Sequence, residues 1–154
     1  MKTRTILATA AGFFASLALC LAADMNTGTW KLNEAKSKFA PGATKLLTVV
    51  YAPAGDMVKV TVDAVDKDGK AIHNEWTGKF DGKDYPVTGD PVYDSRSYTV
   101  VDANTTNITV KKAGKVVGTG KIVVSADGKS RTLTTHSDDP KMTAFNNTAV
   151  YDKQ

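Results

Sequence analysis

Apolar and polar residues alternate with a period of two along most of the chain after residue 24. Valine and alanine alternate with lysine, threonine and aspartate over residues 58–64, and Trp76 and Phe80 belong to a similar alternation over residues 72–80. Such alternation is typical of a β-strand with one buried face. Further segments are rich in Val, Ile, Thr or Tyr, which favour strands: 28–33, 46–52, 96–102, 106–112, 116–125, 131–136 and 144–152.

Short turn sequences separate these segments. Asp-Gly pairs stand at 68–69, 81–82 and 127–128, each followed by lysine, and residues 113–114 form a similar Ala-Gly turn. Asp-Gly supplies the positive φ that tight hairpins need, and strands joined by hairpins run antiparallel. No helical pattern of ten residues occurs after residue 23. We therefore predict an all-β fold, an antiparallel up-and-down β-barrel of about 8–10 strands with short hairpins. A two-sheet sandwich is the alternative, but a barrel leaves no exposed edges.

The first 23 residues have the composition of a cleavable signal peptide. Lys2 and Arg4 precede an uncharged segment, 6–23, that has an apolar centre and ends in two alanines. A secretory signal requires this order of charge, apolar segment and small residues. We therefore assign residues 1–23 to a signal peptide and residues 24–154 to a single barrel domain, and we expect a periplasmic or secreted bacterial protein.

Cys20 is the one cysteine of the chain, and the segment 17–20 resembles a bacterial lipobox. A lipobox has a small residue directly before the cysteine, where this chain has Leu19, so a soluble form is favoured over a lipoprotein. Cleavage also removes Lys2 and Arg4, which lowers the basic count from 20 to 18 against 16 acidic residues and the net charge from +4 to +2. A domain with this charge and no cysteine is not expected to bind nucleic acid, form disulfides or hold zinc through thiolates.

The inward faces of the predicted strands carry large apolar side chains together with Gly78, Gly118 and Gly120. Glycines there either allow the sharp coiling of a filled barrel or leave room for a cavity. A barrel of about eight strands is just wide enough for either arrangement. The sequence therefore leaves open whether the interior is filled or holds a small ligand.

The first predicted strand opens with Gly28-Thr29-Trp30, which resembles the Gly-x-Trp signature of lipocalins, antiparallel barrels that carry small hydrophobic molecules. In that family the tryptophan packs at the closed end of the barrel under a basic residue from a late strand. The resemblance therefore implies structural roles for Gly28, Trp30 and Arg131, although Arg131 lies one strand earlier than the lipocalin pattern places it. The chain also departs from that pattern in having no C-terminal helix after Tyr151.

Two further segments carry resemblances. Residues 76–90 are similar to exported bacterial lipocalin-like proteins of unknown role. Residues 30–33 and 37–39 resemble the opening of YceI-like proteins, periplasmic lipocalin-like barrels that bind polyisoprenoid chains. The lipocalin and YceI-like resemblances imply a barrel that binds an apolar molecule, and neither implies catalysis.

Three groups of polar residues have spacings found in metal sites or hydrolases. The acidic residues and glycine of segment 66–75 fall at calcium-loop positions, but the flanks are strands where helices are required. His73 and Glu75 share one face of a strand, and residues 136–138 read His-Ser-Asp. A hairpin and a solvent-exposed face explain the first two groups, and catalytic triads are assembled across a fold rather than from chain neighbours. We expect no metal, no cofactor and no catalytic residue.

The sequence as a whole predicts a non-enzymatic barrel that binds a small apolar or amphipathic ligand, such as a lipid or an isoprenoid. We assign the ligand-binding wall to Trp76, Phe80, Tyr98 and Val100, with Asn74 as the polar contact. The alternatives are a filled barrel that binds an envelope protein or polymer on its outer face, and a hydrolase. We expect a monomer that does not stay inserted in a membrane after the signal is removed.

Overall fold

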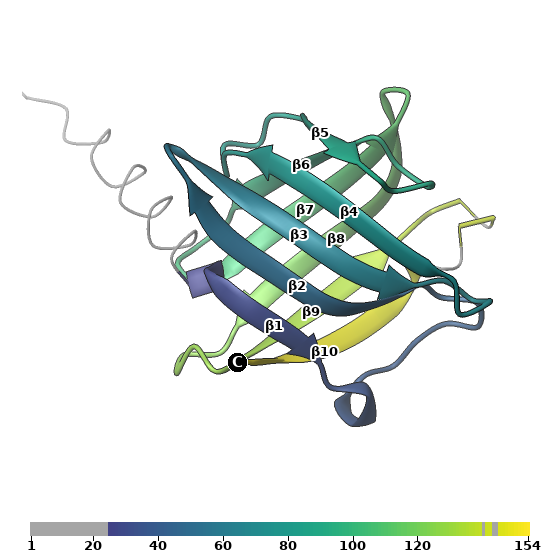
Figure 1. The fold of residues 1–154 in the computed structure, drawn as a ribbon, viewed down its shortest axis with the longest axis horizontal. Helices are drawn as coiled ribbons and strands as arrows, with labels where there is room; N and C mark the ends of the chain where they lie inside the picture. Colours follow the sequence, from purple (N-terminus) through teal and green to yellow (C-terminus); the bar gives the residue numbers. More distant parts are fainter. Residues whose placement is uncertain (1–24, 140, 143–144) are drawn as a thin grey trace, which may run out of the picture.

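The computed structural model describes residues 25–139, 141–142 and 145–154, so the predicted signal peptide and Cys20 lie outside the described residues. Ten antiparallel strands close into one barrel (Figure 1). The strands are β1 (Gly28–Leu32), β2 (Lys45–Ala54), β3 (Met57–Val65), β4 (Ala71–Gly78), β5 (Tyr85–Thr88), β6 (Ser95–Val100), β7 (Thr105–Lys112), β8 (Lys115–Val124), β9 (Ser130–His136) and β10 (Asn147–Lys153). A 3-10 helix, η2 (Glu34–Lys36), follows β1. Within the described part of the chain, no helix has the length and apolar character needed to cross a membrane.

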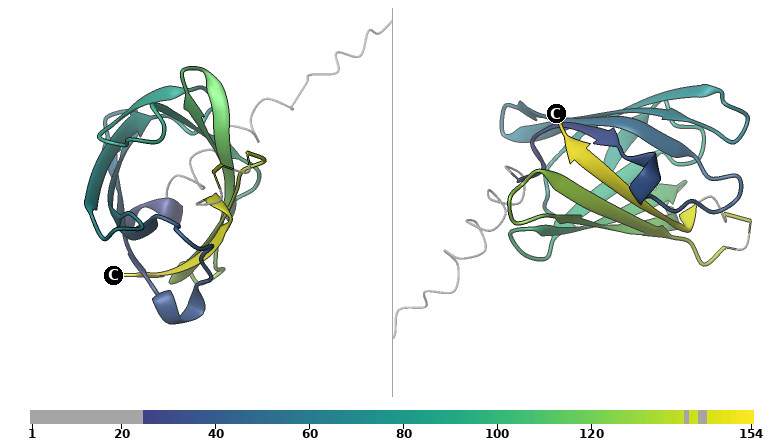
Figure 2. Two further views of the ribbon diagram at one scale, coloured as in Figure 1. Left: turned by 90° about the vertical axis from the view of Figure 1, so that its right-hand side faces the viewer. Right: turned by 90° about the horizontal axis from the view of Figure 1, so that it is seen from below.

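The predicted all-β, up-and-down barrel with short hairpins is confirmed. Each strand pairs with the next along the chain, and β10 pairs with β1 to close the ring. Figure 2 shows this ring in a view along the barrel, with the yellow β10 completing the wall. The closing pair sets Trp30 opposite Lys153 and Leu32 opposite Tyr151.

One strand of the barrel, β5, was not predicted. The segment expected to be a single strand over 72–80 ends at Gly78, and the chain then turns before β5 begins at Tyr85. β5 has four residues, and Pro86 within it has no N–H to donate to a neighbouring strand. A strand this short shows no readable alternation, so the sequence pattern did not reveal it.

The β3–β4 hairpin explains the calcium-like spacing in the sequence. Gly69 has φ +78°, a conformation that glycine adopts without strain. The Asp66 carboxylate accepts hydrogen bonds from the backbone N–H groups of Asp68 and Lys70, both at 2.9 Å. These residues therefore shape a tight turn between two strands.

The two ends of the barrel differ. β1 begins at the end that carries the β2–β3, β4–β5, β6–β7 and β8–β9 hairpins, which we call the closed end. Trp30 and Trp76 pack inside this end and are 0% and 1% exposed. The opposite end, which we call the open end, carries the β3–β4, β5–β6, β7–β8 and β9–β10 connections together with the longer segment between β1 and β2.

Trp76 is the centre of the first of two aromatic groups at the closed end. Its ring meets that of Tyr98 edge-on at 4.7 Å between centroids and that of Tyr85 at 5.8 Å. Phe80 stacks on Tyr98 at 4.7 Å. The Trp76 indole N–H donates to the backbone carbonyl of Arg96 at 2.9 Å. The space beside Gly78 is occupied by the Trp76 and Tyr85 rings, so this glycine makes room for aromatic packing rather than for a cavity.

Arg131 is the centre of the second group. Its guanidinium carbon lies 4.8 Å from the ring centroids of Trp30 and Tyr51 and 5.1 Å from that of Tyr151. Aromatic faces attract a guanidinium, and more strongly where water is excluded. The Trp30 indole N–H donates to the carbonyl of Asn26 at 2.7 Å, which fixes the turn before β1 over this end. The structure thus places Arg131 against Trp30, although its strand, β9, is the last but one.

Candidate functional site

A cavity of about 180 Å³ lies between the aromatic groups and the open end of the barrel. Most of its wall is apolar and comes from inward-facing residues of the strands. These apolar residues are Leu46, Val49, Val62, Ala64, Ile72, Val92, Ile108, Val110, Ile122, Leu133, Met142 and Phe145. The barrel is therefore not packed throughout, which decides between the hollow and filled interiors that the sequence left open.

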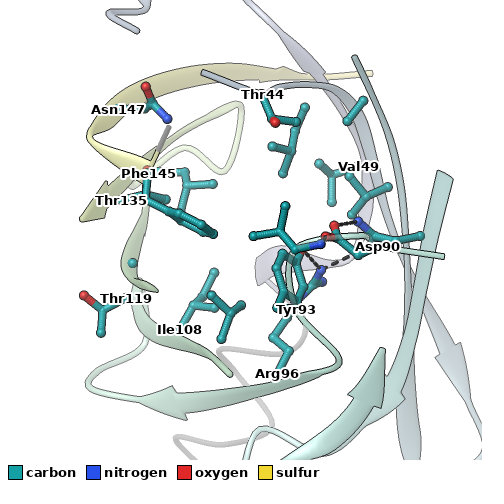
Figure 3. A pocket seen from close by; sticks show the side chains of 18 of the residues that line it. Thr44, Val49, Asp90, Tyr93, Arg96, Ile108, Thr119, Thr135, Phe145 and Asn147 are labelled. Carbon is teal, nitrogen blue, oxygen red and sulfur yellow. Dashed lines mark hydrogen bonds between the residues drawn. The ribbon is translucent and has the colours of Figure 1, made fainter. Parts of the chain in front are cut away.

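Residues of two connections form the mouth of this cavity. Val92 and Tyr93 come from the β5–β6 connection, and Met142 and Phe145 come from the β9–β10 connection. Figure 3 shows Tyr93 and Phe145 on opposite sides of the space. The Phe145 ring occupies the room that Gly118 leaves, since a Cβ at that position would stand 2.7 Å from the ring. Gly120, on the same strand, lines the cavity itself.

Arg96 is the most prominent polar residue of the wall. It lies near the start of β6, at the open end, and is 4% exposed. Its guanidinium donates to the Tyr93 hydroxyl at 2.7 Å, to the Asn74 side-chain oxygen at 3.1 Å and to the Tyr98 hydroxyl at 3.2 Å. A buried guanidinium keeps its charge, because arginine is not deprotonated in proteins.

The tyrosines around Arg96 are neutral. Burial raises the pKa of Tyr98 above its ordinary value of 10.0, although Arg96 acts against that shift. Burial likewise raises the pKa of Tyr93. Among the described residues, no carboxylate forms an ion pair with Arg96. The positive charge of Arg96 is therefore solvated by neutral oxygens.

Asp90 is held at the edge of this polar group by the β5–β6 connection. Its carboxylate accepts from the Asn74 side-chain N–H at 2.8 Å and from the backbone N–H of Val92 at 2.9 Å. The preceding Gly89 has φ +83°, and a Cβ there would overlap the backbone carbonyl of His73. Only glycine lets the chain pass this close to β4, so Gly89 fixes where Asp90 lies.

Two buried polar atoms of cavity-lining residues have no hydrogen-bond partner in the described structure, Thr135 Oγ1 and Arg131 Nε. Buried polar groups are nearly always paired with protein or water, so an unpaired one needs an explanation. Thr135 lies on the opposite side of the cavity from Asp90 and Arg96 (Figure 3).

The residues predicted to form the ligand-binding wall fall into two groups in the structure. Asn74 and Tyr98 line the cavity, whereas Trp76, Phe80 and Val100 are not among its lining residues. Trp76 and Phe80 are buried in the aromatic packing of the closed end. Three of the five predicted wall residues therefore lie outside the cavity lining, toward the closed end, and contact of any of the five with a ligand stays a prediction.

Sequence reasoning missed Arg96, Tyr93 and Asp90. A signal for Arg96 was present, because it alternates in phase with Tyr98, which was assigned to the inward face. Its charge argued for an outward position. Tyr93 and Asp90 lie in a connection, where side chains do not alternate between the inside and the outside as they do in a strand. No sequence signal therefore places them in the wall.

The predicted pair His73 and Glu75 lies on the outer surface of the barrel, in a group of exposed ion pairs. His73 Nδ1 lies 2.6 Å from an Asp63 carboxylate oxygen, and its Nε2 lies 3.8 Å from Glu75. Glu75 also pairs with Lys59 at 2.8 Å. Among the described residues, no group of three His, Cys, Asp or Glu side chains is arranged to hold a metal ion.

We expect the pKa of His73 to be above its ordinary value of 6.5, because the hydrogen bond that its ring N–H donates to the Asp63 carboxylate outweighs the opposing effect of desolvation. The raised pKa stabilises the fold below the ordinary pKa, and this contribution is lost as pH rises through the folded-state pKa. An NMR titration of the His73 ring protons measures this pKa. Asp63→Asn should lower the pKa of His73 toward 6.5. The matched change Asp138→Asn, beside His136, should leave the pKa of His73 unchanged. An unchanged His73 pKa in Asp63→Asn would contradict the assignment.

The second histidine, His136, lies at the end of β9. Its ring nitrogens are 2.9 Å from Asn146 Oδ1 and 2.9 Å from Asp138 Oδ1. The neighbouring Ser137 hydroxyl donates to the carbonyl of Val117 at 2.8 Å. The serine and histidine that the sequence placed side by side thus have separate partners.

No protein-family model and no curated protein sequence matches the chain. Among solved structures, EF1p2_mFAP2b bound to DFHBI is similar with a TM-score of 0.48 and 16% identity, over 89% of this chain and 100% of that one. A redesigned β-barrel, mFAP1, bound to DFHBI, is similar with a TM-score of 0.46 and 16% identity, over 86% of this chain and 98% of that one.

Proposed function

We propose that this protein is an exported, non-enzymatic barrel that binds one small apolar or amphipathic molecule in its interior. The observation that carries the proposal is the largely apolar cavity of about 180 Å³ at the open end. An apolar cavity of about 150 Å³ is sufficient to bind benzene in another protein. A compact molecule with one ring or a short branched chain suits the space available here.

The volume of the cavity restricts the class of ligand. Pockets that enclose drug-sized molecules measure about 300–1,000 Å³, well above the 180 Å³ found here. A long lipid or isoprenoid chain would insert only one end and leave the rest outside the mouth. We therefore favour a compact ligand over the long-chain ligand that the YceI-like resemblance implies.

One feature of the sequence and one of the structure support the exported and non-catalytic parts of the proposal. The charge, apolar segment and terminal alanines of residues 1–23 are those of a secretory signal. Ser137 donates to a backbone carbonyl, and both ring nitrogens of His136 have side-chain oxygen neighbours. We propose that the molecule is carried or sensed without being converted.

Filling the cavity tests this function. Ala64 is 5% exposed and lines the cavity, so Ala64→Leu adds three carbon atoms to the interior. Ala52 is exposed on β2, so Ala52→Leu makes the same change outside the barrel. The probes are benzyl alcohol, benzoate, hexan-1-ol and hexanoate, titrated against the purified protein and followed by NMR at the methyl groups of Ile108, Ile122 and Leu133.

We expect at least one probe to shift these methyl signals in the wild type and in Ala52→Leu. Ala64→Leu should weaken that binding roughly tenfold or more, because added side-chain volume competes with the ligand for the same space. Circular dichroism checks that both variants fold. The proposal is wrong if no probe shifts the lining methyls in the wild type, or if Ala64→Leu binds as well as Ala52→Leu. Native mass spectrometry of the purified protein would in addition give the mass of a co-purifying ligand.

A further inference from the structure

The wall of the cavity carries an excess of positive charge. Its charged residues are Arg96, Arg131, Lys141 and Asp90, which together give a charge of +2. Lys141 is exposed at the mouth, whereas Arg96 and Arg131 are 4% and 2% exposed. A buried charge is costly unless it is paired, so a cavity with this balance is best suited to a negatively charged occupant.

The two buried arginines differ in where they lie and in what surrounds them. Arg131 is covered by the rings of Trp30, Tyr51 and Tyr151, which compensate its charge from three sides. Arg96 donates hydrogen bonds to neutral hydroxyl and amide oxygens, and these three hydrogen bonds do not use all five N–H donors of a guanidinium. Arg131 Nε has no hydrogen-bond partner among the described residues, but Arg131 lies under these rings at the closed end, whereas Arg96 lies at the open end. Arg96 is therefore the arginine that an anion entering through the mouth meets first.

The position of Arg96 fits that role. It lies near the open end, beside Tyr93 of the mouth, so an anionic group reaches it without crossing the whole apolar interior. Asp90, the one acidic residue of the wall, is already engaged by Asn74 and the Val92 N–H. No ion pair joins Asp90 to Arg96 in the described structure, so the guanidinium has no carboxylate partner there.

The opposite side of the cavity offers a second polar contact. Thr135 Oγ1 is buried and has no partner among the described residues. A hydroxyl both donates and accepts, so it pairs with either a second oxygen or an N–H of the ligand. Between Arg96 and Thr135 the wall is apolar, with Ile108 and Ile122 on it.

We propose that the ligand of this barrel is a compact organic anion, whose carboxylate pairs with Arg96 and whose apolar body fills the space beside Ile108 and Ile122. This inference rests on the proposed function, because it names the chemical class of the molecule bound in the same cavity. Charge-assisted hydrogen bonds from arginine to a carboxylate are about twice as strong as neutral ones, so an anion should bind better than a neutral molecule of the same shape.

The test compares benzoate with benzyl alcohol, which have the same ring and differ in charge. Both are titrated at pH 7 against the wild type, Arg96→Met and Lys121→Met. Methionine at position 96 keeps much of the length of the side chain and removes its charge. Lys121 is exposed on β8, so Lys121→Met removes one positive charge outside the cavity and serves as the matched control.

We expect the wild type and Lys121→Met to bind benzoate roughly tenfold or more tightly than benzyl alcohol, and Arg96→Met to lose this preference. Equal or tighter binding of benzyl alcohol by the wild type would overturn the inference and leave the proposed function standing. A benzoate preference that survives in folded Arg96→Met would overturn the role of Arg96. Absence of binding by both compounds and by hexanoate and hexan-1-ol would overturn the function and the inference together. If Arg96→Met does not fold, the comparison in the wild type still decides whether the anion is preferred.

Discussion

Replacing Trp76 with alanine is expected to lower the free energy of unfolding by about 3–5 kcal/mol, the usual cost of removing a buried tryptophan side chain. Trp76 is 1% exposed, and its ring contacts those of Phe80, Tyr85 and Tyr98. The change also leaves the backbone carbonyl of Arg96 without the indole N–H that donates to it. Denaturation with urea, followed by circular dichroism, measures the loss.

Trp76→Phe is the matched variant. It keeps an aromatic ring beside Tyr98 and removes the N–H donor, so its cost should fall clearly below that of alanine. Because Trp76 lies behind Tyr98 and outside the lining of the cavity, folded Trp76→Phe should bind a cavity probe within about threefold of the wild type, a difference well below 1.4 kcal/mol. Complete loss of probe binding in this folded variant would show that Trp76 contacts the ligand, as the sequence pattern alone predicted.

Replacing Trp30 with alanine is expected to destabilise the protein by a similar amount, about 3–5 kcal/mol, for a different reason. Trp30 is 0% exposed and is one of the three rings around Arg131. Its removal leaves an empty space beside the buried guanidinium of Arg131. It also removes the indole N–H that donates to the Asn26 carbonyl and holds the turn before β1. The loss is therefore the sum of a lost ring, a lost hydrogen bond and a less well compensated charge.

Two variants separate these contributions. Trp30→Phe keeps a ring face toward Arg131, so it should be more stable than Trp30→Ala. In the background of Arg131→Met the Trp30 ring no longer faces the guanidinium, so Trp30→Ala should cost less there than in the wild type, and this double-mutant cycle isolates the coupling between the two residues. Additive effects of the two substitutions would contradict a direct interaction between Trp30 and Arg131.

The architecture was predictable because it depends on local signals. Alternation over 58–64 reports which face of a strand is buried, and Asp68-Gly69 reports a tight hairpin. Both signals need only a few neighbouring residues. β5 was not predictable in this way, because Pro86 and the shortness of the strand leave no period to read.

The site was predictable only in part, because the depth of a residue along the barrel axis depends on how all the strands are tilted and staggered. Asn74 and Trp76 are both inward-facing on β4, two positions apart, yet one lines the cavity and the other packs under it. The alternation of the sequence predicts only that both side chains face inward. Arg96 shows a second limit, because the rule that charged side chains face water fails where neutral oxygens are gathered around the charge.

The pairing of β1 with β10 has a consequence for the order in which the molecule assembles. Every other pair of neighbouring strands is joined by a single connection, so each forms soon after its second strand is available. The pair that sets Trp30 opposite Lys153 must wait for the last residues of the chain. Contacts between such distant segments are slow to form, because most of the chain has to be ordered before they are reached. We expect the β1–β10 pair to form last, so that a growing chain has Trp30, Arg131 and the future cavity open to solvent until its final strand is available.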